Sequence, residues 1–244
     1  MPTLRLLALE GIAPKGDTLV IDKPLALSLN SSLEGGLLAI LKDDDEIENN
    51  NGQALWLLDD ASASTLVAKT GDAAPGSAET FQTFGKPTID GSGNIFFWAS
   101  LLNDSEGEGL YLFSEGALST LATSNAAINV FGNDHSYSSF MDPAVNENGA
   151  LAVFATLADE DGQAILTRSA DGTWSILAQT GMLAPGTFGG VSFDRFSLPR
   201  INNGGQIAFQ ATLAGTGDAI SNTTDGGIWA QDSNGVLSLI LRKG

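Results

Sequence analysis

Phe140-Met-Asp-Pro-Ala-Val-Asn146-Glu-Asn-Gly149-Ala-Leu-Ala-Val153 is the stretch that decides the fold, because its landmarks recur at a fixed spacing. Its phenylalanine, proline, Asn/Asp and glycine stand again 56 residues earlier and 56 residues later, in the segments 84–97 and 196–209. Four matched positions at one period indicate internal repeats. The fold of a repeat protein is misassigned when its repeats are overlooked. A decayed fourth copy is expected at Ser32-Leu-Glu-Gly35-Gly-Leu-Leu-Ala39, with Leu29 in place of the proline.

A second landmark falls between the copies. Gly71-Asp-Ala-Ala-Pro75-Gly76 matches Gly181-Met-Leu-Ala-Pro185-Gly186, 110 residues later and close to two periods away. The segment 6–14 carries the same element at the start of the chain, and 238–244 carries its strand at the end. The chain therefore begins and ends on the same strand of the repeat.

The local chemistry within each copy is that of strands and turns. Asn-x-x-Gly places residues that tolerate a positive φ at a tight turn. Alternating apolar residues follow it, as in Gln206-Ile-Ala-Phe-Gln-Ala-Thr-Leu213, which is the period of a strand. A third strand is expected at 54–58, 110–113, 164–167 and 228–230, and Asp171-Gly172 indicates a hairpin before a fourth.

We therefore predict an all-β repeat protein of four antiparallel units of about 56 residues, which most resembles a small β-propeller. An open β-stack, or a fragment of a longer array, is the alternative, because one such sheet cannot bury both of its faces alone. The prediction treats residues 1–244 as a single β-repeat domain. Its units span 12–71, 72–125, 126–181 and 182–244, with an extra strand at 3–11.

The third copy, Asn202-x-x-Gly205-x-x-Ala208-Phe209, resembles a motif that names a family. With the Gly71–Gly76 element, it is similar to the bacterial tandem-repeat proteins of the NxxGxxAF motif, secreted or surface proteins of the "choice-of-anchor" type. The resemblance covers about residues 4–244 and implies a β-repeat fold and export, with no catalytic residues. The sequence departs from the motif at Ser32, Asp90 and Phe96.

Composition excludes several classes of function. The 244 residues include 29 acidic and 11 basic side chains, for a formal net charge of −18, and such a surface repels nucleic acid. There is no cysteine, which excludes disulfides and thiolate sites and is common in extracytoplasmic bacterial proteins. No run of about 18 apolar residues is present, so no membrane-spanning helix is expected.

Two sets of residues are candidates for binding. Clustered Asp, Glu and Asn side chains in loops between the second and third strands would supply oxygen ligands for calcium. The candidate calcium ligands are Asp43, Asp45, Asp159 and Asp161, and the alternative is a set of solvated hairpin tips that discourage aggregation. Trp56, Tyr111 and Trp229 fall on the same strand of the repeat and would form a platform for a sugar or peptide, unless they pack between blades.

No catalytic constellation is found. The one histidine, His135, lies in the run Asp-His-Ser, and neighbouring residues cannot converge as a triad. We expect a non-catalytic extracytoplasmic module for binding, adhesion or scaffolding, with a protein or glycan partner and no cofactor other than calcium. The alternatives are a carbohydrate-active propeller enzyme that uses acidic residues, and a structural subunit of a filament or surface assembly that self-associates through exposed strand edges.

Overall fold

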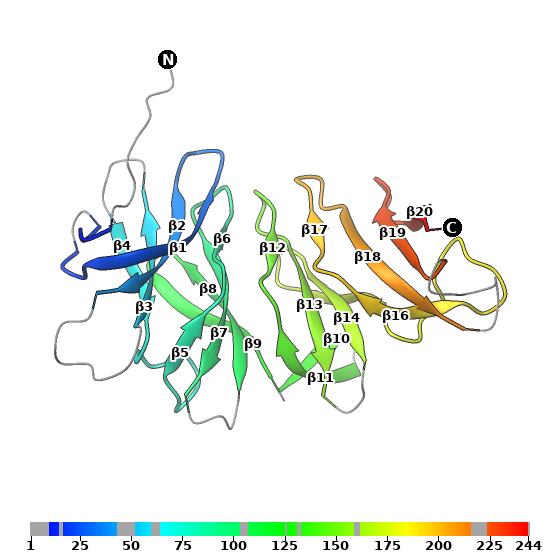
Figure 1. The fold of residues 1–244 in the computed structure, drawn as a ribbon, viewed down its shortest axis with the longest axis horizontal. Helices are drawn as coiled ribbons and strands as arrows, with labels where there is room; N and C mark the ends of the chain where they lie inside the picture. Colours follow the sequence, from blue (N-terminus) through cyan, green and yellow to red (C-terminus); the bar gives the residue numbers. More distant parts are fainter. Residues whose placement is uncertain are drawn as a thin grey trace, which may run out of the picture. The chain divides into compact units, whose positions relative to one another are not determined.

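Strands and turns make up the whole of the described chain, which lacks helices. The structure is a computed structural model, and it describes residues 10–14, 17–42, 52–59, 64–102, 107–124, 126–130, 133–158, 162–215 and 224–243. The chain divides into two compact units, Met1–Ala122 and Thr123–Gly244. Each unit holds two antiparallel sheets, which we call blades (Figure 1).

The first unit contains blades 1 and 2. Blade 1 has the strand order β1-β2-β3-β4, and blade 2 has the order β5-β7-β8-β9 with β6 paired to β7. Their bounds are β1 Ile21–Leu29, β2 Gly35–Leu41, β3 Gln53–Leu58, β4 Ser64–Lys69, β5 Phe81–Phe84, β6 Thr88–Ile89, β7 Ile95–Leu101, β8 Glu108–Ser114 and β9 Ala117–Thr123.

The second unit contains blades 3 and 4. Blade 3 has the order β10-β11-β13-β14-β15 with β12 paired to β13, and blade 4 has the order β16-β18-β19-β20 with β17 paired to β18. Their bounds are β10 Ala127–Val130, β11 Asn133–Phe140, β12 Ala144–Val145, β13 Leu151–Leu157, β14 Gln163–Arg168, β15 Trp174–Gln179, β16 Ser192–Phe196, β17 Arg200–Ile201, β18 Ile207–Ala214, β19 Gly226–Gln231 and β20 Leu237–Arg242.

The predicted fold class, an all-β repeat of four antiparallel units of the propeller type, is confirmed. One sheet falls within each predicted unit, although the chain that was predicted as a single domain divides into two compact units. Residues 3–9 of the predicted extra strand lie outside the described residues.

Alternation along the strands builds the core of each blade. In β18 the odd-numbered residues from Ile207 to Leu213 are buried, and the residues between them are more exposed. In blade 4 the ring of Trp229 meets Phe193 edge-on at 5.0 Å and stacks on Phe209 at 6.4 Å. In blade 2 the ring of Tyr111 is packed in the same way, so the aromatic core repeats from blade to blade.

The Asn-x-x-Gly motif forms a tight turn, and the side chain of its asparagine closes this turn with hydrogen bonds. The Oδ1 atom of Asn146 accepts hydrogen bonds from the backbone N–H groups of Asn148 and Ala150, both at 3.0 Å. Gly149 follows with a φ of 80°, a conformation that only glycine adopts without strain. In the turns at Asp90, Asn202 and Asp232, the side-chain Oδ1 atom likewise accepts the backbone N–H of the residue four positions later. At Asp232, these backbone donors hold the pKa of the carboxyl below its usual range.

The register of the first copy corrects the sequence prediction. The turn is closed by Asn30, whose Oδ1 accepts from the N–H groups of Ser32 and Glu34, and not by Ser32 itself. Leu33 takes the place of the motif glycine and has a φ of 65°, whereas the predicted Gly35 pairs with Leu29 at the start of β2. The prediction was wrong because it followed the glycine, and the fold here holds a leucine in the left-handed region.

The same asparagine also bonds to the next blade of its unit. The Nδ2 atom of Asn30 donates to the backbone oxygen of Asp90 at 2.8 Å, and that of Asn146 donates to the backbone oxygen of Asn202 at 3.1 Å. One motif residue therefore closes its own turn and fixes the turn of the following repeat.

Replacing Leu33 by glycine is expected to stabilise the protein by about 1 kcal/mol, because the left-handed conformation is strained for leucine and free for glycine. The Leu33 side chain is 68% exposed, so little buried surface is lost. Thermal unfolding followed by circular dichroism measures the change. Leu25→Gly, in the middle of β1, is the control and should destabilise, and a lowered melting temperature for Leu33→Gly would contradict the assigned turn.

Tyr137 should make stability fall at alkaline pH. Its buried hydroxyl has no hydrogen-bond partner among the described residues, and burial raises the pKa of this phenol from 10.0 to about 12. Since the neutral form is favoured in the fold, this contribution is complete below pH 10 and is lost as the pH rises from 10 to 12. Tyr137→Phe should remove that part of the alkaline loss and add about 1 kcal/mol at neutral pH, as measured by urea unfolding across this range.

Candidate functional site

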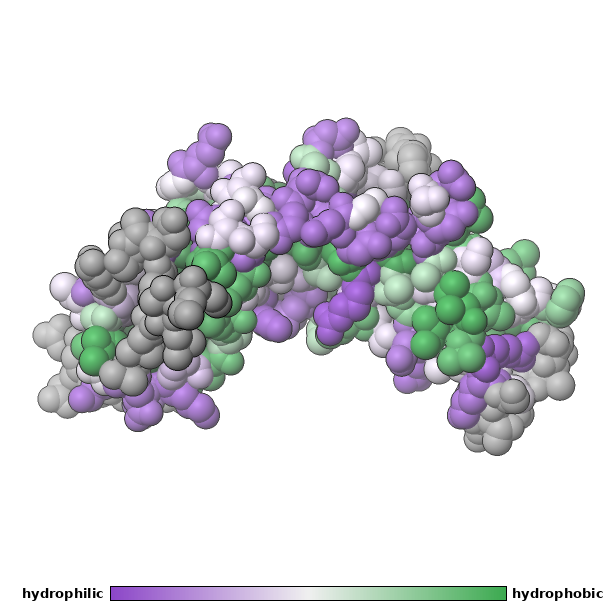
Figure 2. Space-filling model, turned by 90° about the horizontal axis from the view of Figure 1, so that it is seen from above, coloured by the Kyte–Doolittle hydropathy of each residue, from purple (hydrophilic) through white to green (hydrophobic). Residues whose placement is uncertain are grey.

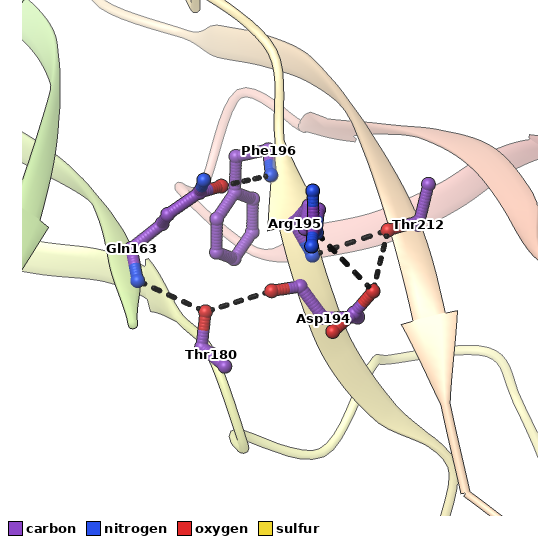
Figure 3. A network of polar contacts seen from close by, with 6 residues as sticks. All are labelled: Gln163, Thr180, Asp194, Arg195, Phe196 and Thr212. Atoms are coloured by element: carbon purple, nitrogen blue, oxygen red, sulfur yellow. Dashed lines mark hydrogen bonds and ion pairs between the residues drawn. The ribbon is translucent and has the colours of Figure 1, made fainter. Parts of the chain in front are cut away.

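A small polar network, which we call the latch, joins blade 3 to the first strand of blade 4 (Figure 3). The Oε1 atom of Gln163 accepts the backbone N–H of Phe196 at 2.8 Å. The hydroxyl of Thr180 accepts the backbone N–H of Gln163 at 3.0 Å and donates to the backbone oxygen of Asp194 at 2.8 Å. Two side chains of one blade therefore satisfy backbone groups of the next.

Blades 1 and 2 are joined by the same latch. Gln53 accepts the backbone N–H of Phe84 at 2.8 Å through its Oε1 atom. The hydroxyl of Thr70 accepts the N–H of Gln53 and donates to the backbone oxygen of Gln82 at 3.1 Å. The latch is thus a property of the repeat, made by a glutamine that begins the third strand and a threonine that follows the fourth.

Blade 4 exposes the face that corresponds to the stacking face of blade 3. In blade 3 the paired residues Phe154, Ile165 and Ala178 form a row, and the last two are buried against the aromatic core of blade 4. The corresponding row in blade 4 is Gln210, Ile228 and Leu241. Ala178 is 1% exposed and Leu241 is 61% exposed. We call the side of β18, β19 and β20 that carries this row the outer face of blade 4.

A groove of about 550 Å³ lies on the outer face. Its floor is mainly apolar, and hydrophobic side chains gather over the C-terminal blade toward the right of Figure 2. The described lining has no Asp, Glu, His or Cys, but it has three cationic side chains. The lining residues are Arg195, Phe196, Ser197, Gln210, Ala211, Thr212, Gly226, Gly227, Ile228, Leu241, Arg242 and Lys243.

Two of these residues occupy the latch positions of blade 4. The backbone N–H of Lys243 donates to the oxygen of Gly226 at 2.8 Å, as that of Thr180 donates to Gln163. Gly226 therefore stands where blades 1 and 3 have glutamine, and Lys243 stands where they have threonine. The outer face has lost the latch and carries a hollow and a cation in its place.

The cations of the groove have polar partners within the described residues. Arg195 Nε lies 4.0 Å from a carboxylate oxygen of Asp194, and Lys243 Nζ lies 3.7 Å from one of Asp225. The Arg195 and Lys243 side chains are 77% and 58% exposed, and exposed pairs contribute little to stability. Arg242 Nε donates to the backbone oxygen of Thr224 at 3.1 Å. These contacts orient the three cationic side chains along the groove.

The three aromatic residues proposed as a binding platform are core residues. Trp56, Tyr111 and Trp229 are each fully buried, so none presents a ring face at the surface. The indole N–H of Trp56 donates to Asp17 at 2.6 Å, and that of Trp229 donates to the backbone oxygen of Pro185 at 3.0 Å. Packing, the alternative prediction for this strand, is what the structure shows. Trp56 lies in a core cluster of blade 1, and Tyr111 and Trp229 lie in clusters that join the two blades of their units.

The four candidate calcium ligands, Asp43, Asp45, Asp159 and Asp161, lie outside the described residues, so the calcium site stays a prediction. In the described ranges, no three His, Cys, Asp or Glu side chains are placed to hold a metal ion together. The same part of the chain has no helix long and apolar enough to span a membrane.

The groove could not be predicted directly from the sequence. Its cations are the neighbours Arg242 and Lys243 and, 47 residues before Arg242, Arg195, and no local pattern connects Arg195 with the other two. The available signal was the change from Gln-Ala at 53–54 and 163–164 to Gly-Gly at 226–227. That change has meaning only once the role of the glutamine is known.

Comparison with solved structures agrees with the fold. Oligogalacturonate lyase in complex with manganese matches with a TM-score of 0.51 and 14% identity over 90% of this chain and 53% of its own. The chain thus spans about half the length of that enzyme. Zg3597, a family 117 glycoside hydrolase from the marine bacterium Zobellia galactanivorans, matches with a TM-score of 0.39 and 10% identity over 96% of this chain and 73% of its own.

Sequence comparison places the chain in a family. No curated protein sequence matches it. One family profile, described as "Family of unknown function (DUF7453)", matches residues 2–244, which is nearly the whole chain. The protein therefore belongs to the DUF7453 family.

Proposed function

We propose that the protein is a non-catalytic extracytoplasmic binding module, used in adhesion or scaffolding, and that its binding surface is the outer face of blade 4. The observation that carries the proposal is the row Gln210, Ile228 and Leu241, which is open in blade 4 although its counterpart in blade 3 is covered. An apolar surface next to charged groups is typical of an interaction site. The resemblance to secreted NxxGxxAF repeat proteins supports the location.

The chemistry of the groove favours binding over catalysis. General acid–base catalysis and glycoside hydrolysis need carboxylates or histidine within reach of the substrate. The described lining has cations, amides, hydroxyls and apolar groups, and it lacks carboxylate and imidazole groups. Such a set can hold an anionic or polar partner, and the carboxylates nearest to its cations, Asp194 and Asp225, form ion pairs with them.

An array of neutral glycans, acidic glycans and peptides tests the proposal when it is combined with a turnover assay on the same compounds. We expect the wild-type chain to retain at least one class without changing it. Leu241→Ser should weaken that binding without a change in melting temperature, because the side chain is exposed. Turnover, a failure to retain any probe, or binding that Leu241→Ser leaves intact would overturn the proposal.

A carbohydrate-active enzyme is the second candidate. It is supported by the likeness in fold to oligogalacturonate lyase, whose name gives an acidic sugar chain as its substrate. Turnover of a polysaccharide that is lost in Asp→Asn variants of the acidic loops would establish it. The same assay, with manganese or calcium and with chelator, would show whether the predicted acidic loops take part.

A further inference from the structure

The first strand of blade 1 exposes two leucines at positions where the other blades are covered. In blades 2, 3 and 4 a buried proline stands three residues before the Asn/Asp that closes the turn. Counted from Asn30, the corresponding residue of blade 1 is Leu27, which is 43% exposed. Leu29 is 51% exposed, whereas its counterpart in blade 2, Ile89, is 6% exposed. The two leucines therefore form an apolar pair at the surface of blade 1.

In blade 2 the preceding blade covers the proline. A Cβ atom built on Gly36 of blade 1 would lie 3.2 Å from the Cβ atom of Pro87. Gly36 stands six residues after the turn asparagine of its blade, and Ala152 and Ala208 have the same place in blades 3 and 4. Ala152 is fully buried in the core that blades 3 and 4 share, whereas Ala208 is only half-buried. Arg200, the exposed partner of Ala208 in the strand pair, adds an aliphatic stem beside it.

The turn asparagine of blade 4 carries an unused donor. Asn30 and Asn146 are 6% and 4% exposed, and the Nδ2 atom of each donates to the turn of the next blade. Asn202 closes its own turn in the same way but is exposed, and within the described ranges its Nδ2 atom makes no hydrogen bond. The acceptor that would complete the pattern is the backbone oxygen of a following turn.

The latch is missing from blade 4 and from the start of blade 1 in a matched way. The latch glutamines of blades 1 and 3 accept the backbone N–H groups of Phe84 and Phe196, each six residues before the turn residue of its blade. Blade 4 has Gly226 in place of the glutamine, and blade 1 has Pro24 in place of the phenylalanine. Proline has no N–H to donate. A copy of blade 1 that follows blade 4 would therefore leave no latch donor without its acceptor.

We infer that a second copy of the chain docks on the outer face of blade 4, with its Leu27 and Leu29 on Ala208 and the backbone oxygen of its Asn30 at the Nδ2 atom of Asn202. The occupant follows from continuity, because the contact repeats the one that blade 2 makes with blade 1. This inference rests on the proposed binding surface and names a second copy as its partner. Ala208 lies outside the groove lining, two residues from Gln210 on the same side of β18. Because two different surfaces meet, the association is head-to-tail.

Disulfide cross-linking between two singly substituted chains tests the inference, since the chain has no cysteine of its own. Leu27→Cys in one chain and Ala208→Cys in a second chain of different mass occupy the positions whose counterparts in blades 2 and 1 lie 3.2 Å apart. A disulfide joins Cβ atoms about 3.5–4.5 Å apart. We expect oxidation of the mixture to give mainly the mixed disulfide. Phe188→Cys, 78% exposed and in the same unit as Ala208, is the control and should react with Leu27→Cys far more slowly.

Analytical ultracentrifugation over a range of concentrations measures the Kd of self-association. Leu27→Asp should raise the Kd by about tenfold or more, because docking would bury a carboxylate against an apolar surface. Leu102→Asp, in blade 2, is the matched control, since Leu102 is 44% exposed and the charge change is the same. Each copy has a net charge of −18, so screening should lower the Kd as salt rises from about 0.05 to about 0.5 M.

A mixed disulfide, together with self-association that Leu27→Asp weakens and Leu102→Asp does not, supports the inference. A wild-type chain that stays monomeric at about 0.5 mM, a Kd that Leu27→Asp leaves unchanged or that rises with salt, or cross-linking no faster than with Phe188→Cys would overturn it. So would a monomer closed by its own disulfide when one chain carries both cysteines. The binding function is judged separately, and it stands if the array retains a probe through Leu241 while the chain stays monomeric.

Discussion

Replacing Trp229 by alanine is expected to lower the free energy of unfolding of the second unit by about 3–5 kcal/mol. The side chain is fully buried between Phe193 and Phe209, and its indole N–H is bonded to the backbone oxygen of Pro185. Removal would leave a cavity in the aromatic core and an unpaired carbonyl. Urea unfolding followed by far-ultraviolet circular dichroism measures the loss.

Phe188→Ala is the matched control, because this ring belongs to the same unit and is 78% exposed. It should change the free energy of unfolding by less than about 0.5 kcal/mol. A Trp229→Ala protein of native stability that had lost ligand binding would contradict our assignment. It would return Trp229, with Trp56 and Tyr111, to the role of a binding platform.

Replacing Asn146 by alanine should have the second-largest effect, about 2–4 kcal/mol. The residue is 4% exposed and makes three side-chain hydrogen bonds, two within its turn and one to the backbone oxygen of Asn202 in the next blade. Truncation leaves two part-buried backbone donors and one backbone acceptor without these partners. Thermal and urea unfolding report the change.

Asn202→Ala separates the bond between blades from the turn. Asn202 occupies the same position of its own turn but is exposed, and its Oδ1 accepts the N–H of Gln206 at 3.0 Å. Its loss should cost only about 1 kcal/mol. Asn146→Asp, which keeps the oxygen that closes the turn and removes the donor to the next blade, should fall between the two. Equal effects at 146 and 202 would show that the asparagine acts within its turn alone.

The parts of the fold that depend on local chemistry could be predicted from the sequence. The glycines at 93, 149 and 205 mark turns because a positive φ is cheap only for glycine, and alternation marks strands because side chains point to opposite faces. The same rule misplaced the first turn, since Leu33 takes a positive φ without being glycine. At Leu33 the turn geometry of the repeat overrides the preference of leucine for a negative φ.

The candidate site could not be predicted, because it depends on what covers each face. Ile165 and Ile228 have similar strand contexts, yet the first is fully buried and the second half-buried. Ile165 is buried because the aromatic core of blade 4 packs against it, which is a tertiary contact. The burial of the aromatic residues could not be predicted for the same reason. Gly226 and Lys243 are recognised as different only by comparison with Gln163 and Thr180, which form the latch in blade 3.

Hydrogen–deuterium exchange with and without the glycan or peptide that the array retains tests the central claim, that the outer face of blade 4 is the binding surface, most directly. We predict that added protection appears in peptides covering 194–197, 210–212, 226–228 and 241–243, which carry the groove, and that Leu241→Ser weakens it. Protection elsewhere in the chain that spares these four segments, or the same protection in Leu241→Ser, would contradict the claim.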